Sequence, residues 1–183
     1  MIKVLMQEKI FKTLNACRAN DKDGREVLQA LHITKNHIEA TDGRMLVRAT
    51  RENAGIPESA KPGVYKIIAA GKKDIGGFIE AALELLDMEY PNTDAVMPGR
   101  GKQADQFNII IRGSKADILS ISSAILMLYK KTGNGYAGHL LDRLAGLGES
   151  WTTGAPGENK PIRLDCEALG EKLTAVIMPF QVG

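Results

Sequence analysis

The sequence of 183 residues predicts an α+β protein, and the order of its short elements is the reason. Its first 50 residues place apolar runs and turn residues around one helical pattern, in the order β-α-β-β-β. After a second long helical pattern, the last part of the chain reads α-β-β-β. The two ends therefore have similar element orders, although their residues show no repeat.

The composition indicates a folded chain, but it does not identify a binding partner. The 24 Lys and Arg residues nearly balance 22 Asp and Glu residues, for a net charge of +2. That balance neither requires nor excludes nucleic acid. A hydrophobic fraction of 44% and a charged fraction of 25% are typical of globular proteins. The length suits one domain or two small ones.

The first helix is predicted over Glu8–Arg18, where Ile10, Leu14 and Cys17 recur at helical spacing. Turn residues at Asn20–Gly24 end this segment. Short runs on either side are expected to form strands: Ile2–Met6, Val27–Thr34, His37–Thr41 and Arg44–Thr50.

The middle of the chain is expected to hold a strand, a helix and a boundary. Gly63–Ala70 is a strand candidate, and apolar residues at helical spacing predict a helix over Asp74–Asp87. Prolines at both ends of the segment Tyr90–Gly101 indicate a loop. We therefore expect two domains, residues 1–98 and residues 99–183, which could also pack as one compact unit.

The second half is expected to begin with a strand over Phe107–Arg112 and a helix over Lys115–Lys131. The residues expected on the inner side of this helix are Ile118, Leu119, Ser122, Ile125 and Leu128. Glycines after this helix are typical of a helix end. The remaining elements are a short helix and three strands: Gly138–Leu147, Glu149–Trp151, Pro161–Glu167 and Lys172–Val182.

Cysteine usage indicates the compartment. Cys17 and Cys166 are the two cysteines, far apart and without a partner motif, so no disulfide framework is expected. The N-terminal segment lacks a signal-peptide pattern, and no apolar run is long enough to span a bilayer. We expect a cytoplasmic protein with reduced thiols and no membrane partner.

The histidines and cysteines of the chain do not have the sequence spacing of known catalytic or metal-binding motifs. His32, His37 and His139 show no metal-ligand pattern, and neither cysteine has a nearby histidine. We therefore expect no catalytic residue, no metal and no cofactor. An enzymatic site around Asp42, Arg44 and His139 remains an alternative without a known catalytic spacing.

Basic residues on the two long helices are candidates for contacts with DNA phosphates: Lys9, Lys12, Arg18, Lys115, Lys130 and Lys131. Such contacts are independent of base sequence and sensitive to salt. A solvated helix face explains the same residues equally well.

Three separate segments resemble the bacterial DNA polymerase III beta subunit, the sliding clamp. Glu39–Leu46 (EATDGRML) is similar to the ATDGHRL signature of that family. Glu89–Pro98 (EYPNTDAVMP) resembles the loop that joins the second and third clamp domains, and Ala175–Phe180 (AVIMPF) resembles the C-terminal VVMPMR. The three segments occur in the family's order.

The resemblance implies a DNA-clamp-like fold of antiparallel sheets with packed helices, built from β-α-β-β-β halves. It also implies a non-enzymatic role as a processivity factor in DNA replication, with double-stranded DNA, a polymerase or other client peptide, and a second copy of the chain as partners. In clamps the three segments line a hydrophobic slot for a short peptide motif. Carried over by position, the slot residues are Thr41, Gly43, Leu46, Pro91, Val96, Val176, Met178, Pro179 and Phe180.

The chain also departs from the family. It is about half the length of a clamp of three domains, and Arg44-Met45 and Phe180-Gln181 replace His-Arg and Met-Arg pairs. A second interpretation is therefore an adaptor that keeps the peptide slot without encircling DNA.

Overall fold

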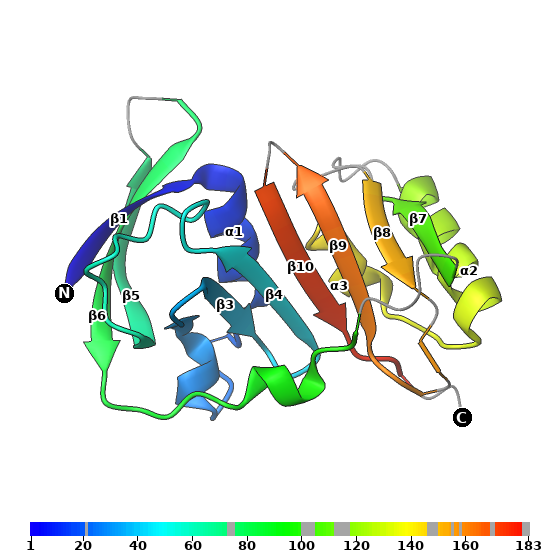
Figure 1. The fold of residues 1–183 in the computed structure, drawn as a ribbon, viewed down its shortest axis with the longest axis horizontal. Coiled ribbons are helices and arrows are strands. Elements are labelled where there is room, and N and C mark those ends of the chain that lie inside the picture. Colours follow the sequence, from blue (N-terminus) through cyan, green and yellow to red (C-terminus); the bar gives the residue numbers. More distant parts are fainter. Residues whose placement is uncertain are drawn as a thin grey trace. The chain divides into compact units, whose positions relative to one another are not determined.

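The computed structural model describes residues 1–20, 22–72, 76–99, 105–111, 118–145, 150–154, 156–157, 159–168 and 171–180. By its internal contacts the chain divides into two compact units, Met1–Pro91 and Asn92–Gly183. Each unit has its own strands, helices and buried residues (Figure 1).

The first unit pairs six strands in the order β1-β6-β5-β2-β3-β4, and each pair is antiparallel. Helix α1 packs against β1, β3, β4 and β6. The elements are β1 (Ile2–Gln7), α1 (Glu8–Cys17), the 3-10 turn η1 (Glu26–Gln29), β2 (Leu31–Ile33), β3 (His37–Thr41), β4 (Met45–Thr50), β5 (Gly63–Lys72) and β6 (Phe78–Leu86).

Helix α1 lies where the sequence pattern predicts it. Ile10, Leu14 and Cys17 are buried, whereas Lys9 and Lys12 are exposed. The helix is therefore amphipathic, and its apolar stripe covers the sheet. Its packing explains why a helix of ten residues is stable here, since such a length is marginal in isolation.

The helix expected over Asp74–Asp87 is wrong, because Phe78–Leu86 forms strand β6 between β1 and β5. Residues 73–75 lie outside the described part. The apolar residues of this segment fit both a helical period and the alternation of Ile79, Ala81 and Leu83, which are the buried ones. Pairing with two neighbouring strands decides in favour of the strand.

The strand expected over Val27–Thr34 is correct only in its second half. Glu26–Gln29 forms η1 and buries Leu28, and Leu31–Ile33 forms β2. The turn lets Ala19 donate its backbone N–H to the carbonyl of Leu28 at 2.9 Å. This bond ties the segment after α1 to η1.

The second unit pairs four antiparallel strands in the order β10-β9-β8-β7. Helix α2 packs against β7 and α3. The elements are the 3-10 turn η2 (Thr93–Val96), β7 (Gln106–Ile110), α2 (Ile118–Thr132), α3 (Gly138–Asp142), β8 (Ser150–Gly154), β9 (Ile162–Ala168) and β10 (Glu171–Ile177). Its most deeply buried large side chains include Trp151, Tyr136, Ile109 and Ile111.

Two details of the second unit differ from the sequence pattern. Leu119, expected on the inner side of α2, is 80% exposed, because Ala124 and Leu128 on the opposite side are the buried ones. Helix α3 ends at Asp142 and continues only as a turn to Ala145. The start of the expected helix at Lys115 lies outside the described residues.

The predicted α+β class is confirmed. The order β-α-β-β-β in β1 to β4, and strand, helices and three strands in β7 to β10, matches the expected arrangement. Among the helices that the structure describes, none combines the length and the apolar character that crossing a bilayer requires.

Candidate functional site

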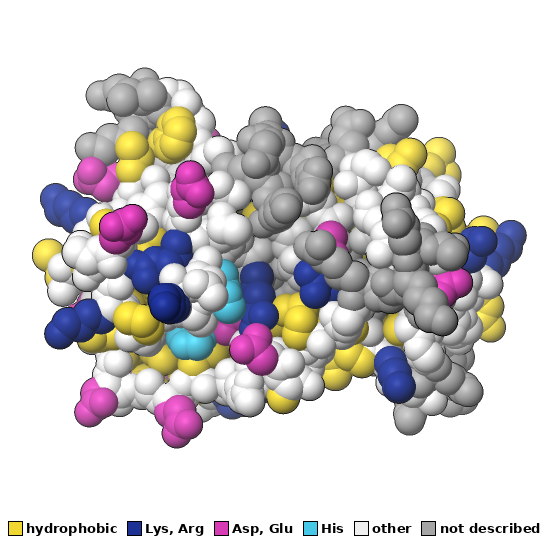
Figure 2. Space-filling model, viewed as in Figure 1, with side chains coloured by type: hydrophobic (Ala, Val, Ile, Leu, Met, Phe, Trp, Pro, Cys, Tyr) yellow, Lys and Arg dark blue, Asp and Glu magenta, His cyan; other side chains and the backbone are white. Residues whose placement is uncertain are grey.

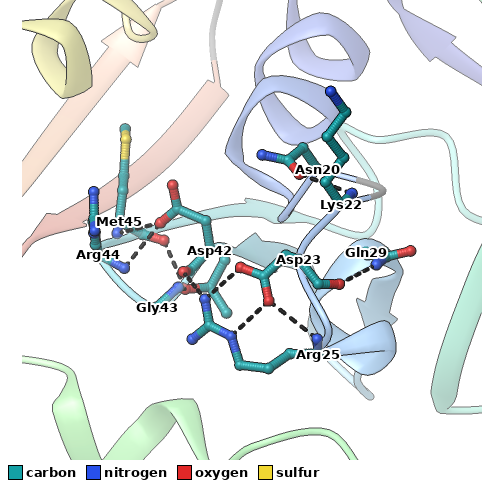
Figure 3. Close-up of polar contacts among 10 residues, drawn as sticks. Asn20, Lys22, Asp23, Arg25, Gln29, Asp42, Gly43, Arg44 and Met45 are labelled. Carbon is teal, nitrogen blue, oxygen red and sulfur yellow. Dashed lines mark hydrogen bonds and ion pairs between the residues drawn. The ribbon is translucent and has the colours of Figure 1, made fainter.

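The turn between β3 and β4 carries the first of the three signature segments (Figure 3). Gly43 has a φ of +84°, a backbone conformation that favours glycine. The hydroxyl of Thr41 donates to the carbonyl of Met45 at 2.6 Å and accepts from the N–H of Gly43 at 3.0 Å. The threonine thus closes the turn from inside and is itself buried.

Asp42 has a structural role in the same turn. One of its carboxylate oxygens accepts the backbone N–H groups of Arg44 and Met45, each at 2.9 Å. Such Asx bonds are typical of tight turns. The enzymatic alternative around Asp42, Arg44 and His139 gains no support from this geometry, since the carboxylate of Asp42 accepts main-chain N–H groups of the turn.

Arg25 supports this turn from outside, and sequence reasoning missed it. Its Nη2 donates to the carbonyl of Asp42 at 3.1 Å and to a carboxylate oxygen of Asp23 at 2.7 Å. The hydrogen bonds from Arg25 lower the pKa of Asp23 to about 2. A Cβ on Gly43 would lie 2.8 Å from Nη1 of Arg25, so a side chain there would displace the end of this arginine.

A buried carboxylate lies on β3, two residues before Thr41. Glu39 is fully buried and accepts from Nε of Arg48 at 2.5 Å on β4. His32 on β2 places Nδ1 2.8 Å from its other oxygen, and Nε2 of His37 lies 3.2 Å away. Arg48 supplies a positive charge, and Arg48 and His32 supply the hydrogen bonds that a buried carboxylate needs.

Tyr90 fixes the end of the first unit next to this cluster. Its ring stacks on His32 with centroids 4.5 Å apart, and it packs with Ala30 and Val64. Burial, followed by the charge of Glu39, raises the pKa of the Tyr90 hydroxyl. The chain therefore leaves the first unit at a defined point, just after Pro91, which is exposed.

The second unit contains a groove of about 600 Å³. Val96 and Met178, both predicted slot residues, lie in its wall and are 43% and 38% exposed. Its lining also contains side chains that sequence reasoning did not select: Ala95, Met97, Pro98, Gly99, Gly154, Pro156, Lys160, Pro161 and Arg163. The two prolines before β9, Pro156 and Pro161, were the available signal, because proline stiffens loops that form binding surfaces.

Arg163 on β9 holds one side of this groove in place. Its guanidinium contacts both carboxylate oxygens of Asp165 at 3.0–3.1 Å, and its Nη1 donates to the carbonyl of Pro98 at 3.4 Å. The segment after η2 is thereby tied to the sheet. Gly154 and Arg163 also line a second, polar groove of about 380 Å³, whose wall includes Thr152 and Asp165.

The C-terminal signature segment contributes only one residue to the groove. Met178 lines it, whereas Val176 is 2% exposed in β10, and Phe180 places its ring against Gly135. Phe180 also donates its backbone N–H to the Gly135 carbonyl at 3.1 Å. Pro179 is half-buried.

The remaining predicted slot residues belong to the first unit: Thr41, Gly43, Leu46 and Pro91. Leu46 is 3% exposed, and Gly43 is exposed at the turn. Their participation in a slot stays a prediction.

The basic residues proposed for DNA contacts are partly engaged within the protein. Lys12 pairs with Glu8 at 2.7 Å, and Arg18 donates to Asn15 and to the Gln29 carbonyl. Lys131 lies 6.0 Å over the ring of Phe107. Lys9 and Lys130 are exposed, and Lys115 lies outside the described residues.

No group of three histidine, cysteine or carboxylate side chains able to hold a metal ion occurs among the described residues. Cys17 and Cys166 are both buried in different units, and neither forms a disulfide.

Comparison of the whole chain with solved structures identifies the fold. The Helicobacter pylori beta clamp matches with a TM-score of 0.60 at 11% sequence identity, over 98% of this chain and 66% of that one. The chain has the fold of a bacterial sliding clamp. The Bacillus subtilis DNA polymerase sliding clamp matches with a TM-score of 0.56 at 14% identity, over 100% of this chain and 65% of that one.

The DNA polymerase sliding clamp of Pseudomonas aeruginosa is a third match, with a TM-score of 0.57 and 13% identity, covering 99% of this chain and 66% of that one. No protein-family model and no curated protein matches the sequence. The chain thus spans somewhat less than two thirds of these clamps' length. The clamp-like fold that the three signature segments imply is confirmed.

Proposed function

We propose that this chain is a non-enzymatic, clamp-like protein that binds a short linear peptide of a client protein, such as a polymerase, in the groove of its second unit. The observation that carries the proposal is the joint placement of Val96 and Met178 in the wall of that groove. These two residues come from two different signature segments, 82 positions apart (178 − 96).

The chemistry of the groove suits a peptide with apolar anchors. Its wall combines methionine with valine and three prolines, which form a largely preformed apolar surface that a flexible thioether can adapt. Lys160 is exposed at the same wall, so an acidic side chain beside the anchors would gain a favourable contact. Arg163, in contrast, is already paired with Asp165.

The test is a titration of a fluorescein-labelled peptide carrying a clamp-binding motif with the full chain, followed by fluorescence anisotropy. We expect saturable binding, weakened about tenfold or more by Met178→Glu, because a few anchor contacts usually dominate such affinities. Met88→Glu is the matched control, because Met88 and Met178 are both 38% exposed and Met88 does not line the groove. Equal affinities for the two variants would contradict the proposal.

A second candidate function is an adaptor that binds client peptides without encircling DNA. Two observations favour it. Lys12 and Arg18, both candidates for contacts with DNA, are engaged by neighbouring groups within the protein. The outer face of α2 exposes Leu119 and Leu126, whereas a face that binds DNA phosphates needs cationic side chains. Retention on circular duplex DNA that is lost on linearisation would support the encircling role in DNA replication. Peptide binding without such retention would support the adaptor.

A further inference from the structure

Asn134 is a buried polar residue directly after helix α2. The helix ends where Gly133 takes a left-handed backbone, with a φ of +72°, and donates its N–H to the carbonyl of Tyr129 at 2.9 Å. The N–H of Asn134 then donates to the hydroxyl of Thr132 at 3.1 Å. Asn134 is only 4% exposed, so its side-chain amide needs hydrogen-bond partners within the protein.

The partners of this amide include main-chain groups of the segment between β8 and β9. Nδ2 of Asn134 donates to the carbonyl of Gly157 at 3.2 Å, and Oδ1 accepts the N–H of Asn159 at 2.8 Å. Nδ2 also donates to the buried hydroxyl of Tyr136 at 3.4 Å, and that hydroxyl donates to the carbonyl of Lys160 at 3.5 Å. One buried amide and one buried phenol therefore hold the main chain at three positions of this segment.

Asn159 has an uncommon backbone conformation at the centre of these contacts. Among the residues that the structure describes, it is the only one other than glycine with a positive φ, at 56°. Asparagine adopts this left-handed region more readily than most residues, but still at a cost. Such conformations persist where the surrounding structure determines them, and they are frequent at functional sites. Here the bond from its N–H to Oδ1 of Asn134 holds the backbone in place.

The anchored segment forms part of the wall of the apolar groove. Pro156, Lys160 and Pro161 all line that groove. The N–H of Lys160 donates to the carbonyl of Gly157 at 3.2 Å, which closes a turn. A Cβ placed on Gly157 would lie 3.5 Å from Cδ and 3.6 Å from Cε of Lys160, so the methylene stem of the lysine lies against the glycine. Figure 2 shows hydrophobic side chains beside a Lys or Arg side chain where Figure 1 draws the start of β9.

We propose that Asn134 is a positioning residue of the groove: it fixes the turn that carries Lys160, and the groove therefore selects peptides with an acidic residue beside their apolar anchor. This selectivity rests on the peptide binding proposed above and adds the class of peptide. Of the two cations in the wall, Arg163 is already paired with Asp165. A lysine on a fixed turn loses less conformational entropy on pairing than one on a mobile loop.

The first test compares two fluorescein-labelled peptides with the same clamp-binding motif, one with Asp and one with Asn beside the apolar anchor. Fluorescence anisotropy at low salt should show that the wild-type chain binds the Asp peptide about two to five times more tightly, and added salt should reduce this preference. Lys160→Gln should abolish it. Equal wild-type affinities for the two peptides would overturn the selectivity and leave the proposed function intact. Binding of neither peptide would overturn both.

A matched pair of variants at residue 159 separates positioning from folding. The residue is exposed, so neither change alters the core. Asn159→Pro fixes φ at about −65° and removes the N–H that Asn134 accepts, whereas Asn159→Gly keeps the N–H and favours a positive φ. We expect the preference for the Asp peptide to be lost in Asn159→Pro and retained in Asn159→Gly. A preference that survives Asn159→Pro would overturn the positioning role.

Hydrogen exchange measures the anchoring without any peptide. The N–H of Asn159 should exchange with solvent about tenfold or more faster in Asn134→Ala than in the wild type, because the variant lacks its acceptor. The N–H of Leu164, a fully buried residue of β9, is the internal reference for a folded second unit. An Asn159 rate that stays the same relative to Leu164 would overturn the role of Asn134.

Discussion

The carboxyl group of Asp23 holds the guanidinium of Arg25 beside the turn between β3 and β4. This ion pair links the segment after α1 to the turn that carries Asp42 and Gly43. It is exposed, so its contribution to stability is small. The ion pair instead orients the guanidinium of Arg25, which also donates a hydrogen bond to the Asp42 carbonyl.

The ion pair of Asp23 with Arg25 predicts how the free energy of unfolding depends on pH. The pKa of Asp23 is lowered in the folded chain from its ordinary value of 3.8 to about 2. Its stabilising contribution is therefore complete above the ordinary value and is lost as the pH falls through about 2. Urea unfolding of the wild type and Asp23→Asn should give a constant difference in free energy near neutral pH, which shrinks in this acidic window. A difference that does not change with pH would contradict this assignment.

The turn between β3 and β4 shows how one glycine fixes an element. Its pairing runs from His37 opposite Thr50 to Thr41 opposite Leu46, so the turn leaves four residues to reverse the chain. The positive φ of Gly43 completes that reversal. Any side chain there would meet both an unfavourable backbone conformation and the guanidinium of Arg25.

Gly43→Ala should destabilise the first unit by about 1–3 kcal/mol, as residues forced into left-handed backbone typically do. Gly24→Ala is the matched control, because nothing lies within 4 Å of a Cβ at that position. Chemical denaturation followed by circular dichroism measures both. A Gly43→Ala variant as stable as Gly24→Ala would show that the turn tolerates a side chain.

At the scale of the whole molecule, the division after Pro91 predicts that the first unit folds alone. Its strands pair with one another in a continuous order, and Tyr90 anchors its last residues on His32. A fragment of residues 1–91 should unfold cooperatively in urea. A fragment that ends at residue 88 should be less stable by roughly 3 kcal/mol, the cost typical of removing a buried aromatic side chain. Non-cooperative unfolding of the longer fragment would contradict the division.

Local sequence determined the elements whose pattern has a single interpretation. The 3.6-residue spacing of Ile10, Leu14 and Cys17 allows only a helix, and Asp42-Gly43 between two β-rich runs allows only a hairpin. The three signature segments likewise led to the clamp fold, because each is a short run with its own residues. Val96 and Met178 were selected in this way, and they line one groove.

Tertiary structure decided the features that depend on distant partners. Phe78–Leu86 fits a helix and a strand equally well, and only pairing with β1 and β5 makes it a strand. The burial of Glu39 depends on His32 and Arg48 from neighbouring strands, and the groove wall depends on Arg163 reaching Pro98, 65 residues away. The local periodicity of apolar residues indicates which side of an element is apolar. It does not record which strand, charge or loop will meet that side after folding.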